Sequence, residues 1–227
     1  MGAFLLEGPH VVAEAVSAGI ALTRMFVLED DSVGIALAER ARVHVTTVTD
    51  AVLARISTTT TPQSPVAIAD IPRPVIPPEG DLLVAWGVSD PGNAGTLIRS
   101  AAAFGMGYVT GPGTADSWAP KVVRSAAGAH FHTSVGNVAE LDQLRVGGRL
   151  VAVAVGTGGE LPAPQTESIA VLVGNEAHGL DATVVAAADL VFTIPMSGRT
   201  ESLNAGVAGS IIAYALSVGK GSGSSPG

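Results

Sequence analysis

Five short and almost wholly apolar runs restrict the fold of this chain more than any other feature. They span residues 82–88, 108–110, 150–155, 169–173 and 190–194. The run 150–155 reads Leu-Val-Ala-Val-Ala-Val, so a strand formed there would have no polar face. Strands of this kind are covered on both sides, as in a parallel sheet with helices on each face. We therefore predict an α/β fold with a parallel sheet for this part of the chain.

The first 71 residues also alternate between short apolar runs and helical patterns. Residues 4–6, 25–28 and 44–48 have the character of strands, and residues 11–18 and 35–41 have that of helices. A polar, turn-rich stretch at 58–65 precedes an apolar run at 66–71, which we expect to be a closing strand. The pattern predicts a separate small α/β unit.

A proline-rich segment separates the two regions. Residues 72–80 contain four prolines, which exclude a helix and favour an extended spacer. We place the domain boundary there, with an N-terminal domain at 1–71, a linker at 72–80 and a larger domain at 81–219. Residues 220–227 are rich in glycine and serine, and we expect them to form a flexible tail.

Composition excludes several classes of protein. The chain has 227 residues, of which 47% are hydrophobic and 14% charged, enough for a well-buried core. It has no apolar run of the ~18 residues that a membrane span needs, and no export signal, so we expect a soluble, cytoplasmic protein without a membrane partner. The absence of cysteine excludes disulfides, thiolate metal sites and cysteine nucleophiles. A formal net charge of −8 requires any contact with nucleic acid to be local.

Common nucleotide, metal and hydrolase signatures are missing. The sequence lacks Gly-x-Gly-x-x-Gly, the Walker-type Gly-Lys-Ser/Thr and Gly-x-Ser-x-Gly. His130 and His132, on an expected strand, lack a third ligand, so we expect no metal site. A dinucleotide-dependent oxidoreductase is disfavoured for want of its glycine fingerprint. Gly156-Thr157-Gly158-Gly159 remains as a candidate ligand loop.

Ligands of open parallel sheets bind beyond the carboxyl ends of the strands, so the loops after residues 88, 155, 173 and 194 are candidate sites. In the first loop, Asn93 is expected to cap a helix that carries Arg99 almost two turns further on. Arg99 is either a solvated side chain or a guanidinium directed at a phosphate, which its planar fork suits.

The other two loops have similar polar features. Gly174 permits close backbone approach after a strand, and Glu176 is either a surface residue or a carboxylate that holds Arg99 or a hydroxyl. Ser202 and Asn204 precede a helix of small residues that continues to Val218. Ser202 is expected at the N-cap with Asn204 in the first turn, so helix capping alone can explain both.

The three loops together resemble the ordered motifs of the SpoU (TrmH-like) branch of the SPOUT RNA methyltransferases. The matching segments are Asp90-Pro-Gly-Asn-Ala-Gly with Arg99, Val173-Gly-Asn-Glu-Ala-His-Gly-Leu, and Ile194-Pro-Met with Glu201-Ser-Leu-Asn. Residues 120–129 also resemble this family, and the resemblance covers about residues 82 to 217. The opening Phe4-Leu-Leu-Glu-Gly and Thr61-Pro-Gln are similar to the small L30e-like substrate-binding domain of many members. Ser64 departs from the glycine that relatives commonly have. Many relatives begin with a further, often basic, N-terminal helix, which we expect this sequence to lack.

The resemblance implies a C-terminal trefoil knot, a homodimer and methyl transfer from S-adenosylmethionine to a ribose 2′-hydroxyl. The residues expected to shape the catalytic site are Arg99, Asn93, Glu176, Ser202 and Asn204. Those expected to contact the cofactor are Gly174, Ile194, Met196, Leu203, Ser202 and Thr157.

Arginine is a poor base because its pKa exceeds about 12. We therefore expect Arg99 to clamp a phosphate and orient the hydroxyl, while Glu176 or an RNA phosphate helps to accept the proton. A local cationic patch of Arg99, Lys121, Arg124 and Arg199 is expected to contact the RNA. The preferred substrate is rRNA (23S). The alternatives are a tRNA ribose 2′-O-methyltransferase and a non-catalytic RNA-binding or ribosome-assembly factor with a relict knot.

Overall fold

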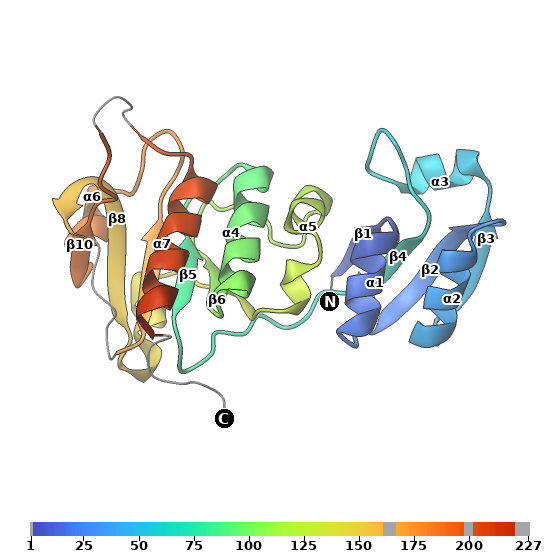
Figure 1. The fold of residues 1–227 in the computed structure, drawn as a ribbon, viewed down its shortest axis with the longest axis horizontal. Helices are drawn as coiled ribbons and strands as arrows, with labels where there is room; N and C mark the ends of the chain where they lie inside the picture. The colour runs from blue at the N-terminus through green and yellow to red at the C-terminus, as the bar shows by residue number, and fades with distance from the viewer. Residues whose placement is uncertain (1, 161–166, 198–201, 221–227) are drawn as a thin grey trace.

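The computed structural model describes residues 2–160, 167–197 and 202–220. Two α/β units lie side by side, and the segment between β4 and β5 runs from one to the other (Figure 1). The last helix continues to Lys220, the first residue of the predicted C-terminal tail. Residues 221–227 lie outside the described residues.

The N-terminal unit is a four-stranded sheet in the order β1-β4-β2-β3. Its elements in chain order are β1 (Ala3–Glu7), α1 (Pro9–Ser17), β2 (Leu22–Leu28), α2 (Ser32–Ala41), β3 (Val45–Val48), α3 (Asp50–Ile56) and β4 (Val66–Asp70). β2 and β3 are parallel, and β4 pairs with β1 and β2 in the antiparallel sense. The predicted strands and helices of this unit are present. The short helix α3, which buries only Leu53, was not predicted.

The C-terminal unit is a six-stranded sheet in the order β10-β8-β9-β5-β6-β7. All of its strand pairs are parallel, which confirms the prediction. The strands are β5 (Leu82–Ala85), β6 (Gly107–Thr110), β7 (Val135–Asn137), β8 (Leu150–Gly159), β9 (Ile169–Val173) and β10 (Leu190–Phe192). The helices are α4 (Pro91–Ala103), α5 (Pro120–Ala126), α6 (Ala182–Ala186) and α7 (Ala205–Lys220), with 3-10 turns η1 (Ala129–Phe131) and η2 (Leu141–Gly148).

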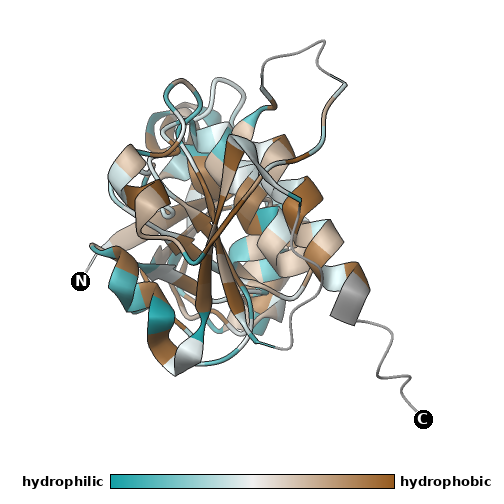
Figure 2. Ribbon diagram, turned by 90° about the vertical axis from the view of Figure 1, so that its left-hand side faces the viewer, coloured by the Kyte–Doolittle hydropathy of each residue, from teal (hydrophilic) through white to brown (hydrophobic). Residues whose placement is uncertain are grey.

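Both faces of this sheet are buried. Leu83 and Ala85 pack with α4 and α7, whereas Leu82 and Val84 pack toward η2 and α6. Figure 2 shows the hydrophobic strands in the middle with helices on either side. Burial on both faces is why the strands read as unbroken apolar runs. Among the described residues, no helix is long and apolar enough to span a membrane.

Two segments differ from their predicted conformation. Residues 156–159 continue β8 rather than forming a loop, because Gly159 pairs with β10 and accepts a hydrogen bond from the Thr193 amide at 3.0 Å. A Cβ on Gly158 would lie 2.8 Å from the Phe192 carbonyl carbon, so the glycine permits this close pairing. His130 lies in the 3-10 turn η1 rather than on a strand, and its Nε2 contacts the Ser117 carbonyl at 2.7 Å.

The proline-rich segment is not a free spacer. Arg149 is only 2% exposed, and its guanidinium donates to the carbonyls of Pro77 at 2.8 Å and Gly80 at 2.9 Å. The Val75 amide donates to the Val135 carbonyl at 3.1 Å. A buried guanidinium requires such acceptors, and the linker backbone supplies them. The segment is therefore bound to the C-terminal unit at Val75, Pro77 and Gly80.

Helix α5 joins the two units. Val122 and Ala126 pack into the core beneath α4, whereas Val123 belongs to the core of the N-terminal unit. Close by, the rings of Phe4 and Trp118 lie 4.6 Å apart. The units therefore share a continuous apolar contact.

A polar cluster around Glu7 completes this contact. The Glu7 side chain is 6% exposed, and its carboxylate accepts hydrogen bonds from Ser57 and Thr58. Arg124 Nη1 of α5 lies 3.6 Å from Glu7 Oε1. Burial raises the pKa of Glu7, but these hydrogen bonds and the charge of Arg124 outweigh it and hold the pKa below its ordinary value of 4.5. The charged carboxylate therefore stabilises the folded state.

We expect Glu7→Gln to lower the free energy of unfolding at pH 7 and to flatten its acid dependence. Because the folded pKa is depressed, the contribution of Glu7 is fully present above pH 4.5 and disappears as pH falls through the lower folded value. Urea unfolding between pH 7 and pH 3 measures this. The exposed Glu39→Gln is the matched control, and wild-type and Glu7→Gln stabilities that stay parallel over this range would contradict the assignment.

Candidate functional site

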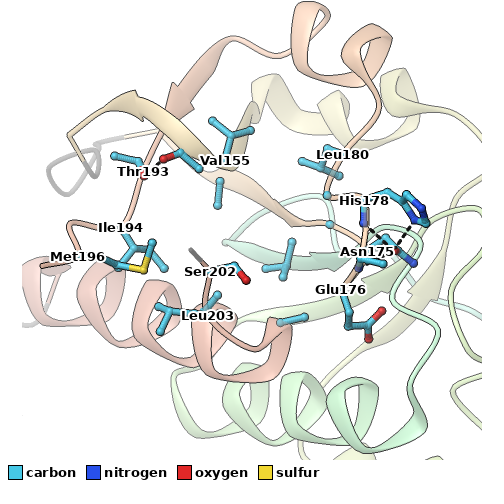
Figure 3. Close-up of a pocket in the computed structure, with 18 residues that line it drawn as sticks. Val155, Asn175, Glu176, His178, Leu180, Thr193, Ile194, Met196, Ser202 and Leu203 are labelled. Atoms are coloured by element: carbon cyan, nitrogen blue, oxygen red, sulfur yellow. Dashed lines mark hydrogen bonds between the residues drawn. The ribbon is translucent and has the colours of Figure 1, made fainter. Parts of the chain in front are cut away.

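A cavity of about 360 Å³ lies beyond the carboxyl ends of β9 and β10 and beside residues 154–156 of β8 (Figure 3). The loop after β9, the segment after β10 and the start of α7 surround it. Its lining includes six residues predicted for the site: Gly174, Glu176, Ile194, Met196, Ser202 and Leu203. The structure thus brings together side chains from two loops that are well separated in sequence.

Four predicted residues lie outside the cavity lining. Thr157 is exposed on the extended strand β8, although the neighbouring Gly156 does line the cavity. Asn93 and Arg99 lie on α4, and Asn204 immediately precedes α7. A cofactor contact at Thr157 therefore has no support from the cavity. Asn93 and Asn204 connect to the cavity residue Glu176 through hydrogen bonds, whereas Arg99 does not.

The cavity combines apolar walls with close backbone. Val155, Leu180 and Leu203 supply apolar side chains. A Cβ added to Gly174 would lie 2.6 Å from the Gly179 carbonyl carbon, so only glycine allows the turn after β9 to close this tightly. Such a site suits a ligand that is held by apolar surface and a few backbone polar groups.

Three predicted polar residues form one hydrogen-bonded chain. Asn93 Nδ2 donates to Glu176 Oε1 at 2.9 Å, and Asn204 Nδ2 donates to Asn93 Oδ1 at 2.8 Å. Asn93 is only 8% exposed, so both ends of its amide are satisfied inside the protein. These hydrogen bonds connect the loop after β9, the first turn of α4 and the start of α7. Sequence reasoning grouped these residues but missed their direct contacts.

The helix caps differ from those predicted. Asp90, not Asn93, caps α4, because its Oδ1 accepts from the Asn93 amide at 2.8 Å. Asn204 holds the start of α7, since its Oδ1 accepts from the Val207 amide at 3.1 Å, and Ser202 lies outside the helix. The side chain of Asn93 is therefore free to bind Glu176 and Asn204.

The charge state of Glu176 follows from its donors. Partial burial raises its pKa, but the Asn93 amide and the backbone amides of Glu176, Asp90 and Ser89 outweigh this and hold the pKa below 4.5. In Figure 3 its carboxylate extends toward α4. Glu176 is therefore ionised at neutral pH and is a weak proton acceptor.

Two of the four residues of the predicted cationic patch are exposed and could contact RNA. Arg99 is exposed on α4, and no hydrogen bond or ion pair joins it to any other described residue. Lys121 is also exposed, on α5. Arg124 is instead occupied by Thr58, at 3.0 Å, and by Glu7. Arg199 lies outside the described residues.

Comparison with known proteins agrees with this geometry. The profile described as the SpoU rRNA Methylase family matches residues 81–214, more than half of the chain. The chain belongs to this SpoU family. Residues 1–67 match the MRM3-like substrate binding domain. The predicted family and the predicted class of RNA methyltransferase are thereby confirmed.

A named relative supports the same SpoU assignment over nearly the whole chain. The 23S rRNA (guanosine(2553)-2′-O)-methyltransferase RlmP of Bacillus subtilis is 34% identical over 219 residues, which cover 94% of this chain and 88% of the relative. An AdoMet-bound rRNA methyltransferase from Sinorhizobium meliloti is 27% identical, with a TM-score of 0.81 over 94% of this chain and 86% of that one.

A second solved structure matches in fold. AviRb from Streptomyces viridochromogenes has a TM-score of 0.87 over 98% of this chain and 92% of its own, at 24% identity. The predicted fold class, a small N-terminal α/β domain followed by a parallel-sheet SPOUT trefoil-knot domain, is thus confirmed.

We expect Asn93→Asp to destabilise this SpoU protein by about 1–3 kcal/mol at pH 7, because it replaces a buried donor with a second carboxylate facing Glu176. Repulsion raises the pKa of one carboxylate, so the penalty is relieved when pH falls below that raised value. Urea unfolding at pH 7 and pH 5 measures both effects. Asn93→Ala, which adds no charge, should lose a similar amount at both pH values. A pH-independent loss in Asn93→Asp would contradict the proposed contact.

Proposed function

We propose that this chain transfers a methyl group from S-adenosylmethionine to a ribose 2′-hydroxyl of 23S rRNA. The observation that carries the proposal is the Glu176–Asn93–Asn204 chain beside the 360 Å³ cavity, in a member of the SpoU family. The Bacillus subtilis relative is named for the same reaction on 23S rRNA. The retained Arg99, Asn93 and Glu176 argue against a non-catalytic relict.

The cavity residues fit the proposed cofactor. Backbone around Gly174, Ile194 and Leu203 would hold its adenine and ribose, while apolar walls such as Leu180 cover them. Met196 and Ser202 would complete the contacts on the α7 side. When bound, S-adenosylmethionine supplies an electrophilic methyl group on a sulfonium. The protein's part is to hold the acceptor hydroxyl in line with that group.

Arg99 is the residue best suited to bind the substrate backbone. Its guanidinium is exposed and has no partner among the described residues, so it can form a bidentate contact with an RNA phosphate. Glu176 holds Asn93 and the loop before α4 instead of acting as the base, because its pKa is lowered. The proton of the 2′-hydroxyl then passes to an RNA phosphate or to solvent.

The N-terminal unit favours rRNA over tRNA. It matches the MRM3-like substrate binding domain, and the relative named for 23S rRNA aligns with 94% of this chain. A solved structure titled for 2-OH methylation of C/U34 on tRNA is 28% identical but covers only 62% of this chain, with a TM-score of 0.55. A tRNA ribose methyltransferase is therefore the second candidate. An rRNA substrate and the lack of cysteine both fit work in the cytoplasm.

The active form is a homodimer through the knotted domain. Four apolar side chains of α7 are exposed at helical spacing: Val207 at 46%, Ile211 at 40%, Tyr214 at 57% and Val218 at 58%. They form one stripe along a helix that already packs on α4. A second copy of the chain would cover this stripe, since exposed apolar stripes mark interaction surfaces.

We expect Tyr214→Glu to convert the dimer to a monomer, because a charge at the centre of the stripe cannot be buried without a partner. Sedimentation equilibrium measures the mass. Val33→Glu, at a site 58% exposed on α2, is the matched control and should stay dimeric. A wild-type monomer, or a dimer that survives Tyr214→Glu, would rule out this interface.

The activity is tested with purified protein, radiolabelled S-adenosylmethionine and 23S rRNA. We expect methylated ribose in wild type, at least a 100-fold lower kcat in Arg99→Ala and unchanged cofactor affinity by calorimetry, because Arg99 positions only the RNA. Arg40→Ala, an exposed arginine on α2, controls for the lost charge. Methylation of tRNA alone would favour the second candidate, and full turnover by Arg99→Ala would refute the role of Arg99.

A further inference from the structure

Three neighbouring loops follow β6, β5 and β9, which lie side by side in the sheet. The middle loop, residues 86–90, leads into α4 and so sets the position of Asn93 and Arg99. The loop after β9 lines the cavity. The loop after β6 begins at Gly111 and does not line the cavity.

Gly87, in the middle loop, is held from both sides. Its amide donates to Thr114 Oγ1 at 3.0 Å, and its carbonyl accepts from Asn175 Nδ2 at 2.8 Å. Thr114 Oγ1 in turn donates to the Ala85 carbonyl at 2.8 Å. Gly87 has φ +74, a conformation that glycine adopts without strain. The backbone of one residue therefore receives a contact from each flanking loop.

Asn175 uses its remaining polar atoms to shape its own loop. Its Oδ1 accepts from the amides of Ala177 at 2.9 Å and His178 at 3.1 Å (Figure 3). Its backbone exchanges two hydrogen bonds with Gly179, at 3.0 and 2.9 Å. These contacts fix the turn that presents Glu176.

The same two loops meet a second time, at Glu176. Its carboxylate accepts from the amides of Ser89 and Asp90, both at 3.3 Å. Two separate contacts fix the orientation of one loop against the other, which a single contact would leave free to pivot. The cavity loop and the start of α4 are therefore joined at Gly87 and again at the helix end.

We infer that Asn175 and Thr114 are positioning residues for methyl transfer, which together hold Gly87 and so place α4 against the cofactor cavity. The inference rests on the proposed function. We propose no contact between either residue and the reacting atoms. Asn175 connects the cavity loop to Gly87, and the Thr114 hydroxyl holds Gly87 from a loop that does not line the cavity.

Thr114 gives the sharper test, because it does not line the cavity. We expect Thr114→Val, which keeps the shape and removes the hydroxyl, to lower kcat about 10-fold, since small displacements of catalytic groups cost that much or more. Cofactor affinity by calorimetry should be unchanged, and Thr114→Ser should restore kcat. Wild-type kcat in Thr114→Val, or equal loss in Thr114→Ser, would overturn the inference.

A double-mutant cycle tests the link to Asn175. Both side chains act on Gly87, so the kcat loss of Thr114→Val with Asn175→Ala should be smaller than the product of the single losses. Multiplicative losses would show independent roles and overturn the inference. Melting temperatures of each variant exclude general unfolding as the cause.

Amide hydrogen exchange tests the same contacts without any turnover. In Thr114→Val, exchange should rise in residues 86–90 and also in residues 174–179, although the Thr114 hydroxyl hydrogen-bonds to Gly87 and Ala85 and to no residue of the second segment. Faster exchange confined to residues 86–90 would overturn the inference. If wild type methylates no RNA, the proposed function fails, and this measurement still decides whether the three loops are joined.

Discussion

All strands of the C-terminal sheet run in the same direction, so their carboxyl ends lie along one edge. This constraint brings together loops that are far apart in sequence. Every predicted site residue except Thr157 lies on one of these loops or on the helix that follows it. Glu176 comes after β9, Asn93 comes after β5, and Asn204 begins the helix that follows β10. The hydrogen-bonded chain among these three residues is possible only because the sheet is parallel and its strand order returns the last helix to α4.

The elements that could be predicted from the sequence are those whose burial requires a continuous run of apolar residues. Strands covered on both faces leave long apolar runs, so β5, β8 and β9 were evident. The short elements β7 and α3 bury little and left no such pattern. The end of β8 depends on its pairing with β10, a partner more than 30 residues away, and local glycines suggested a loop instead.

The site was predicted as a set of residues, but its contacts were not. Capping residues look alike in sequence, and Asp90 and Asn93 are both good N-cap types, so the cap was assigned to Asn93 instead of Asp90. Arg99 and Arg124 also look alike in sequence. The structure separates them, because Glu7 of the other unit takes up Arg124 while Arg99 stays exposed. Contacts between distant segments decide such differences, and a single sequence does not carry them.

The buried guanidinium of Arg149 bears on where this protein can be cut. It reaches four backbone carbonyls, those of Leu144, Val146, Pro77 and Gly80, and two of these belong to the proline-rich segment. A fragment that started at Asp81 would lack the Pro77 and Gly80 carbonyls, so the buried guanidinium of Arg149 would lose two of its four backbone acceptors. The smallest self-sufficient catalytic fragment, or the safest junction for a chimaera with another substrate domain, therefore begins ahead of Pro77. Physically, the proline segment belongs to the catalytic half.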